Sequence, residues 1–309
     1  MDMKNDFRKI IIAELKRFRI SFDESKDTAK LCIEYFQVFD KLFILQGKSK
    51  VEFSKELIDK LAGFDKDTVA AIDDIKSKLE AGQDISPYLS NDIRKAQKAD
   101  MLLRNWNIYH AHVKMPLLNR KKKATRSENL LFFTHDRDTV YFIDVLPHPK
   151  GDEWFSTELL NIIYDNWKQL LRIAPGVTDF SPKMTDKEFT RGMASFCLLA
   201  KVRDCVVFPT NLGVASSGDS VMAVKKADNY LNSLTLLQDF LVESENDILM
   251  RIEKEIDKKF DRGTLQLISI NIGRGQFVLR NSRGDLILTI GFEEGADDNH
   301  SYSVAWEVY

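Results

Sequence analysis

The chain has 309 residues, of which 44% are hydrophobic and 30% are charged, and its formal net charge is −2. This composition is typical of a globular protein with two or three domains and excludes an intrinsically disordered chain. The near-neutral charge excludes a protein that coats nucleic acid through bulk charge, whereas a local basic groove is compatible with it.

No stretch of about 18 apolar residues occurs, so we expect no membrane span, and the N-terminus lacks the apolar core of a signal peptide. The three cysteines, Cys32, Cys197 and Cys205, are odd in number and widely spaced. This pattern favours reduced thiols in a cytoplasmic protein over a disulfide framework. Because no CxxC pair is present, we expect no structural zinc site.

The first part of the chain has apolar residues at helical spacing. This spacing predicts helices over residues 7–18, 30–45, 53–61 and 69–79, and Gly82 is expected to end the last of them. A further helix is expected to begin near Ser90 and to end no later than Pro116.

After residue 126 the pattern changes. Residues 130–133 and 139–143 predict a β-hairpin around a polar turn at 135–138. Helices are expected over 154–171, from a capping box at Thr185 and Glu188 through Ala200, and over 220–258. Four strands follow, over 265–270, 276–279, 286–290 and 301–309, with a tight turn at 282–285.

These elements predict an α+β fold, in which an N-terminal helical bundle is followed by a mixed domain that ends in a small antiparallel β-sheet. We expect a helical domain over residues 1–126. A mixed α/β region with a β-hairpin and long helices would occupy 127–260, and a C-terminal antiparallel β segment would occupy 261–309.

The candidate site is the segment that runs from Arg104 through Asn105 and Asn107 to His110. A guanidinium can hold a phosphate and stabilise charge that develops on it, and an imidazole can exchange a proton near neutral pH. On a straight helix Arg104, Asn107 and His110 form a slanting row, one turn apart, and Asp100 lies one turn before Arg104. In the alternative interpretation these are ordinary polar helix residues.

The pattern Arg-polar-x(4)-His resembles the motif of the HEPN superfamily of ribonucleases and toxins. In that family an arginine, usually a polar residue, three to five further positions and a histidine lie late in a helix of an all-helical bundle. Here Arg104, Asn105 and His110 occupy the motif positions. The resemblance covers roughly the first 120 residues. It implies a homodimer with a shared groove and a role in toxin–antitoxin modules or antiviral defence, with an antitoxin or defence-system protein as partner.

The resulting hypothesis is a metal-independent endoribonuclease without a cofactor. Arg104, Asn105, Asn107 and His110 would be catalytic: the imidazole deprotonates the ribose 2′-hydroxyl, which attacks phosphorus, and the arginine stabilises the phosphorane. A basic run would track the RNA backbone, and it comprises Arg120, Lys121, Lys122, Lys123 and Arg126. A charge run of this kind is equally typical of a solvated loop.

Two other classes of function stay open. In the first, the chain is a non-catalytic helical binding protein and the motif is structural. In the second, it is a metal-dependent hydrolase that uses His110 and His112 with Asp136 or Asp144, which requires the two histidines to share the face of a strand. Walker A, dinucleotide-binding and GxSxG motifs are absent from the sequence, which disfavours NTPases, dehydrogenases and serine hydrolases.

Overall fold

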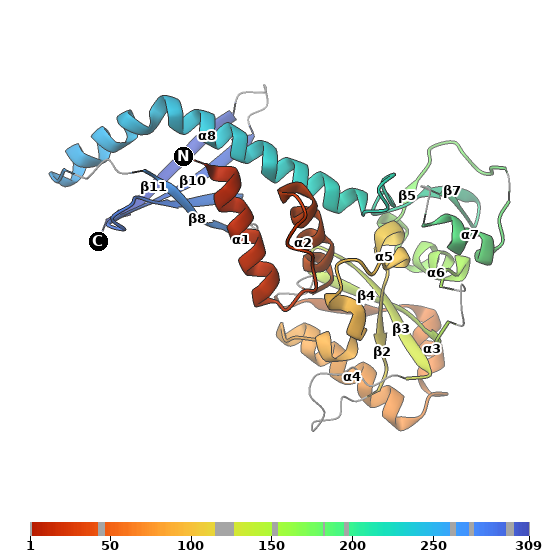
Figure 1. Cartoon of the computed structure of the whole chain (residues 1–309). Helices are drawn as coiled ribbons and strands as arrows, with labels where there is room; N and C mark the ends of the chain where they lie inside the picture. Colours follow the sequence, from red (N-terminus) through yellow and green to blue (C-terminus); the bar gives the residue numbers. More distant parts are fainter. Residues whose placement is uncertain are drawn as a thin grey trace. The chain divides into compact units, whose positions relative to one another are not determined.

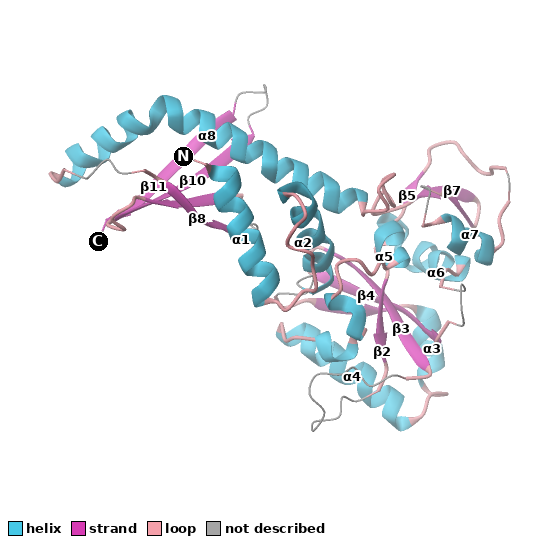
Figure 2. Cartoon of the chain, viewed as in Figure 1, coloured by secondary structure: helices cyan, strands magenta, loops and turns pink. Residues whose placement is uncertain are grey.

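The computed structural model describes residues 2–42, 47–114, 127–149, 154–181, 183–194, 198–259, 264–271, 275–294 and 300–308. Its helices and strands are shown in Figure 1 and Figure 2. The fold is mixed α+β, as predicted. By contacts the chain divides into residues 1–35 with 226–309, and residues 36–225. This division does not follow the predicted boundaries at residues 126 and 260, because the N-terminal and C-terminal segments pack together.

The first unit combines terminal helices with the C-terminal sheet. Helix α1 (Met3–Arg17) lies against β8 (Gln266–Asn271), which pairs in order with β9 (Gln276–Arg280), β10 (Leu286–Glu294) and β11 (His300–Val308). The pairing is antiparallel throughout. Helix α8 (Val221–Ile256) lies along this sheet in Figure 1, where Tyr230 contacts Phe277 and Phe240 stacks on Tyr302. The predicted C-terminal antiparallel sheet is thus confirmed.

The second unit is built on a four-stranded sheet of order β1-β4-β3-β2. The predicted hairpin is confirmed as β3 (Asn129–Asp136) and β4 (Thr139–Pro147), which are antiparallel. Strand β1 (Lys50–Phe53) runs parallel to β4, and β2 (Tyr109–His112) pairs antiparallel with β3 at the other edge. Both outer strands are additions that the sequence analysis missed, because each has only four residues.

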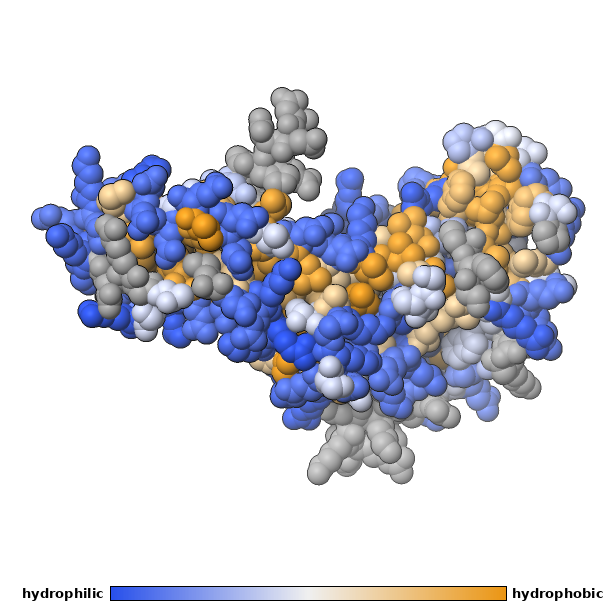
Figure 3. Space-filling model, turned by 45° about the horizontal axis from the view of Figure 1, so that its top comes forward, coloured by the Kyte–Doolittle hydropathy of each residue, from blue (hydrophilic) through white to orange (hydrophobic). Residues whose placement is uncertain are grey.

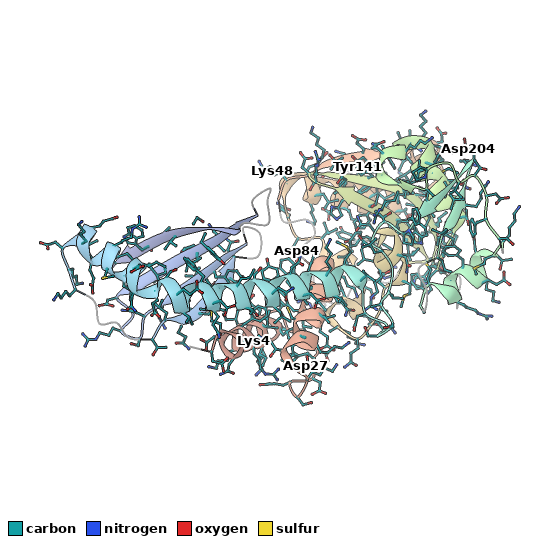
Figure 4. All side chains as sticks on the ribbon, turned by 90° about the horizontal axis from the view of Figure 1, so that it is seen from above. Lys4, Asp27, Lys48, Asp84, Tyr141 and Asp204 are labelled. Carbon is teal, nitrogen blue, oxygen red and sulfur yellow. The ribbon has the colours of Figure 1, made fainter. Side chains whose placement is uncertain are left out.

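Both faces of this sheet are covered by helices. Alternate residues of β3 and β4 point to opposite sides, so each strand presents apolar side chains to both faces. On one side lie α3 (Lys55–Leu61) and α4 (Lys66–Ala81), which pack against Phe133 and Phe142. On the other side α6 (Thr157–Trp167) packs against Phe132 and Ile143. On this side Tyr141, labelled in Figure 4, lies against Trp167 with ring centroids 5.0 Å apart.

A small third sheet of order β5-β7-β6 completes this side. It comprises β5 (Arg172–Ile173), β6 (Ala200–Val202) and β7 (Cys205–Phe208), and the turn between β6 and β7 carries Asp204, which Figure 4 labels. The predicted capping box at Thr185 and Glu188 is confirmed. The helix it begins, α7 (Asp186–Gly192), is shorter than predicted, and Ala200, its predicted end, is the first residue of β6 in the third sheet.

Some large apolar side chains are exposed on the described surface. Figure 3 shows hydrophobic residues gathered in patches among hydrophilic ones on the face that it displays. By exposed fraction, the large apolar side chains on the described surface include Ile58, Val177, Met184, Phe208, Val242 and Met250. Since such residues are ordinary on globular proteins, they indicate no docking surface by themselves.

Candidate active site

The segment from Arg104 to His110 is not one helix. Helix α5 (Met101–Trp106) ends at Asn107, whose φ of 56° places it in the left-handed region, and β2 begins at Tyr109. The predicted helix from Ser90 to Pro116 is therefore wrong, and so is the slanting row of Arg104, Asn107 and His110. The residues before α5 form two short 3₁₀ turns, Ser86–Tyr88 and Asn91–Arg94.

Arg104 is buried, with 6% of its surface exposed. Its guanidinium donates to the Gly218 carbonyl at 2.6 Å and to the Gln37 side chain. Gln37 in turn donates to Asp219 at 2.9 Å. Burial lowers the pKa of Arg104, while the nearby carboxylates of Asp219 and Asp100 oppose that shift. These contacts link α5 to α2 (Thr28–Leu42) and to the loop before α8, so we assign Arg104 a structural role.

The two predicted catalytic asparagines also make structural contacts. Asn105 is fully buried, and its amide donates to the Met101 carbonyl at 2.9 Å. Asn107 donates to the His135 carbonyl at 3.1 Å and accepts from Asn211 at 3.2 Å. Because Asn tolerates positive φ better than most residues, Asn107 is suited to the break between α5 and β2. Neither asparagine lies in the wall of the cavity described next.

His110, by contrast, lines a cavity of about 400 Å³ at the β2 edge of the sheet. Histidines 112 and 148, Asp100, Lys41 and Trp154 also line it. We call this space the histidine cavity. Three of the five histidines in the chain meet there. Clusters of ionisable side chains around one cavity are typical of catalytic sites.

His110 lies next to a carboxylate. Its Nδ1 atom is 3.6 Å from Oδ2 of Asp100, and the two side chains are 13% and 25% exposed. The other Asp100 oxygen accepts from the Leu103 N–H at 3.1 Å and so caps α5. Burial lowers the pKa of His110, Asp100 opposes that shift, and His148 and Lys41 add to it. A neutral imidazole near a carboxylate that can orient it is suited to act as a general base.

A second imidazole belongs to His148. Its Nδ1 is 3.0 Å from the Pro149 carbonyl. Since a carbonyl only accepts hydrogen bonds, this nitrogen carries the hydrogen, and Nε2 is left to accept or, once protonated, to donate. The indole of Trp154 contacts both imidazoles, with centroid distances of 5.1 Å to His110 and 5.4 Å to His148. His148 also stacks on His112 at 6.1 Å.

Lys41 supplies a cation to the same cavity. Its ammonium donates to the Lys98 carbonyl at 2.9 Å, and only 7% of the residue is exposed. Burial lowers the pKa of Lys41, and the carboxylates of Asp100 and Asp92 oppose this shift. Since a desolvated cation interacts strongly with an anion, Lys41 is suited to bind a phosphate.

Two sets of predicted residues remain, namely the basic run and the candidate metal ligands. Arg120, Lys121, Lys122, Lys123 and Arg126 lie outside the described residues. His110 and His112 do share one face of β2, opposite Phe132 and Leu130 of β3. However, within the described ranges no group of three His, Cys, Asp or Glu side chains is arranged to hold a metal ion. Asp144 pairs with Lys60 instead.

Sequence reasoning missed Lys41, His148 and Trp154. Lys41 lies in the last turn of an amphipathic helix, α2, and Trp154 was expected only as the start of a helix. The segment Pro147-His148-Pro149, a few residues after a predicted strand, was a usable signal, because prolines favour the end of a strand and the histidine then lies close to that end. Asp100 was noted, although with Arg104 as its expected partner.

Comparisons with models of protein families, with curated proteins and with solved structures find no match for this chain. Within the described residues, no helix combines the length and apolar character that are needed to cross a membrane.

Proposed function

We propose that the chain is a metal-independent endoribonuclease whose active site is the histidine cavity. The observation that supports this most directly is the meeting of His110, His148 and Lys41 around one cavity, with Asp100 beside His110. Transesterification of RNA needs a base, an acid and a cation, and this set supplies all three. Compared with the sequence-based hypothesis, Lys41 takes the place of Arg104 and His148 is the second proton carrier.

In the proposed reaction, neutral His110 removes the proton from a ribose 2′-hydroxyl, and the resulting oxygen attacks the adjacent phosphorus. Lys41 stabilises the anionic phosphorane. The imidazolium of His148 then gives its proton to the departing 5′-oxygen as the P–O bond breaks. The products are a 2′,3′-cyclic phosphate and a 5′-hydroxyl. DNA lacks the 2′-hydroxyl and cannot react.

The test compares His110→Asn with His135→Gln, in which the altered histidine lies on β3 outside the histidine cavity. With excess chelator, the wild type and His135→Gln should cut RNA to cyclic phosphate ends and leave DNA intact. His110→Asn should be slower by about 10²–10⁴-fold, the usual contribution of a general base.

Other outcomes point to the alternative functions. Activity that is lost with chelator and restored by a divalent metal would favour a metal-dependent hydrolase. RNA binding without cleavage, insensitive to His110→Asn, would favour a non-catalytic binding protein. The homodimer, the cytoplasmic location and the toxin or antiviral-defence role depend on sequence patterns or on the HEPN resemblance, and they stay predictions.

A further inference from the structure

A second, smaller cavity of about 280 Å³ adjoins the histidine cavity. Most of its lining is apolar or aromatic and includes Phe132, Leu146, Trp154 and Leu159, and Ser156 adds a hydroxyl. These residues come from β3, from the end of β4, from the segment just before α6 and from the first turn of α6, and Figure 1 shows these elements. We call this space the aromatic cavity.

The two cavities have walls in common. His148 and Trp154 line both of them. The two rings meet edge to face, with an interplanar angle of 72°. Trp154 also contacts His110, which lines the histidine cavity. A ligand that occupies both cavities would therefore have charged and titratable groups around one part and mostly apolar groups around the other.

We infer that the aromatic cavity binds one base of the RNA whose phosphate lies at His110, an inference that rests on the proposed function. A nucleotide has this same division, with an anionic phosphate next to a flat, largely apolar ring. Bases stack on aromatic side chains when proteins bind single-stranded RNA. The Ser156 hydroxyl accepts from the Glu158 N–H at 3.3 Å, and a hydroxyl that accepts can also donate to an acceptor on the base edge.

The kinetic test uses a DNA oligonucleotide with a single ribonucleotide, so that one phosphodiester can be cut. Two further versions carry an abasic sugar either at the ribonucleotide or at its 3′ neighbour. One of the two should lose about 5- to 150-fold in kcat/KM with wild-type protein, which corresponds to the loss of one stacked base. Equal rates on all three substrates would overturn the aromatic subsite and leave the proposed function intact.

Leu146→Trp should fill the aromatic cavity, because Leu146 is one of its half-buried lining residues. This variant should cut the complete substrate as slowly as the abasic one and should cut the abasic one at the wild-type rate. Val242→Trp is the matched control, since Val242 is 77% exposed on α8. If Leu146→Trp keeps the wild-type preference for the complete substrate, the base does not occupy this cavity.

A binding measurement separates the two proposals without cleavage. Uncharged nucleosides should change the fluorescence of the wild type, and Trp154→Phe and Leu146→Trp should lose that change. If the wild-type protein binds nucleosides but does not cleave RNA, the proposed function is contradicted and the aromatic subsite is not. If adenosine, guanosine, cytidine and uridine all leave the fluorescence unchanged, the aromatic subsite is overturned.

Discussion

Arg104 and His110 are six positions apart in the chain but lie in different surroundings. The guanidinium of Arg104 is enclosed by Gly218 and Gln37, whereas the imidazole of His110 lies in a cavity beside Asp100. The two groups thus have different physical tasks. Arg104 satisfies buried acceptors and joins segments, and His110 lines the cavity to which the proposed reaction assigns the substrate.

Asp100→Asn tests the carboxylate beside His110. Asparagine can still cap α5, so the helix should persist, but the charge that raises the pKa of His110 is lost. That pKa should fall further. Since a general base works in its neutral form, the acid limb of the pH dependence of kcat/KM should move to lower pH.

The control for this change is Asp65→Asn, because Asp65 caps α4 in the same way and lies outside the histidine cavity. Its pH profile should match that of the wild type. An acid limb that stays in place, or moves to higher pH, in Asp100→Asn would contradict the pairing of Asp100 with His110.

Arg104→Lys tests the structural role of the buried guanidinium. Lysine lacks the planar guanidinium fork with which Arg104 donates to both the Gly218 carbonyl and the Gln37 side chain. Loss of one hydrogen bond from a charged group should lower the free energy of unfolding by about 1.5–3 kcal/mol. Arg137→Lys, at the exposed turn between β3 and β4, should change it by less than about 0.5 kcal/mol. Denaturant unfolding measures both values.

The activity of folded Arg104→Lys distinguishes the two roles of this residue. In the structural role, kcat should stay close to that of the wild type at temperatures where the variant is folded. A large loss of kcat with unchanged stability would instead return Arg104 to the catalytic set that the sequence motif predicts.

At the scale of elements, the ends of two helices show which signals act locally. Helix α4 ends at Gly82, as predicted, and Gly82 has a φ of 70°. Helix α5 ends at Asn107 without a glycine, and β2 then pairs with β3. A glycine after a helical pattern is a local signal for the end of the helix. No such local signal marks a helix that ends because the next residues pair with a distant strand.

Gly82→Ala should destabilise the protein by about 1–2 kcal/mol, the cost of a left-handed conformation for a residue with a Cβ atom. An added Cβ would also lie 3.0 Å from the Gly47 carbonyl carbon. Gly63→Ala is the control, because Gly63 does not have a positive φ and its added Cβ would lie 3.4 Å from the Lys60 oxygen. Thermal unfolding of the pair checks this, and equal melting temperatures would refute the strain at Gly82.

At the scale of the whole molecule, the histidine cavity draws its polar groups from distant parts of one chain. Lys41 comes from α2, Asp100 precedes α5, His110 is on β2 and His148 follows β4. The HEPN resemblance implies a groove that two protomers share. The described residues supply a base, a second imidazole and a cation within one protomer, so the proposed chemistry requires no second copy.

A mixing experiment tests this intrachain site. When His110→Asn protein is added to the wild type, total activity should stay proportional to the amount of wild type, because each site comes from one chain. Specific activity should also be independent of protein concentration. A loss of activity beyond dilution would indicate that protomers share residues, as the HEPN resemblance implies.

The sequence alone determined the elements that have a local cause. Apolar periodicity identified α1 to α4, α6 and α8, the Thr185 and Glu188 pair identified the start of α7, and alternation identified β3, β4 and the C-terminal strands. Histidine chemistry also drew attention to His110. All of these signals lie within a few residues of the feature that they predict.

Only the tertiary structure decided which chemical groups meet. Burial of Arg104 depends on Gln37 and Gly218, and the surroundings of His110 depend on Lys41, His148 and Trp154. These partners are separated by tens of residues, so no local pattern encodes their proximity. The pairing of β2 with β3 brings His110 to the cavity, and that pairing follows from packing on both faces of the sheet and not from the propensity of four residues.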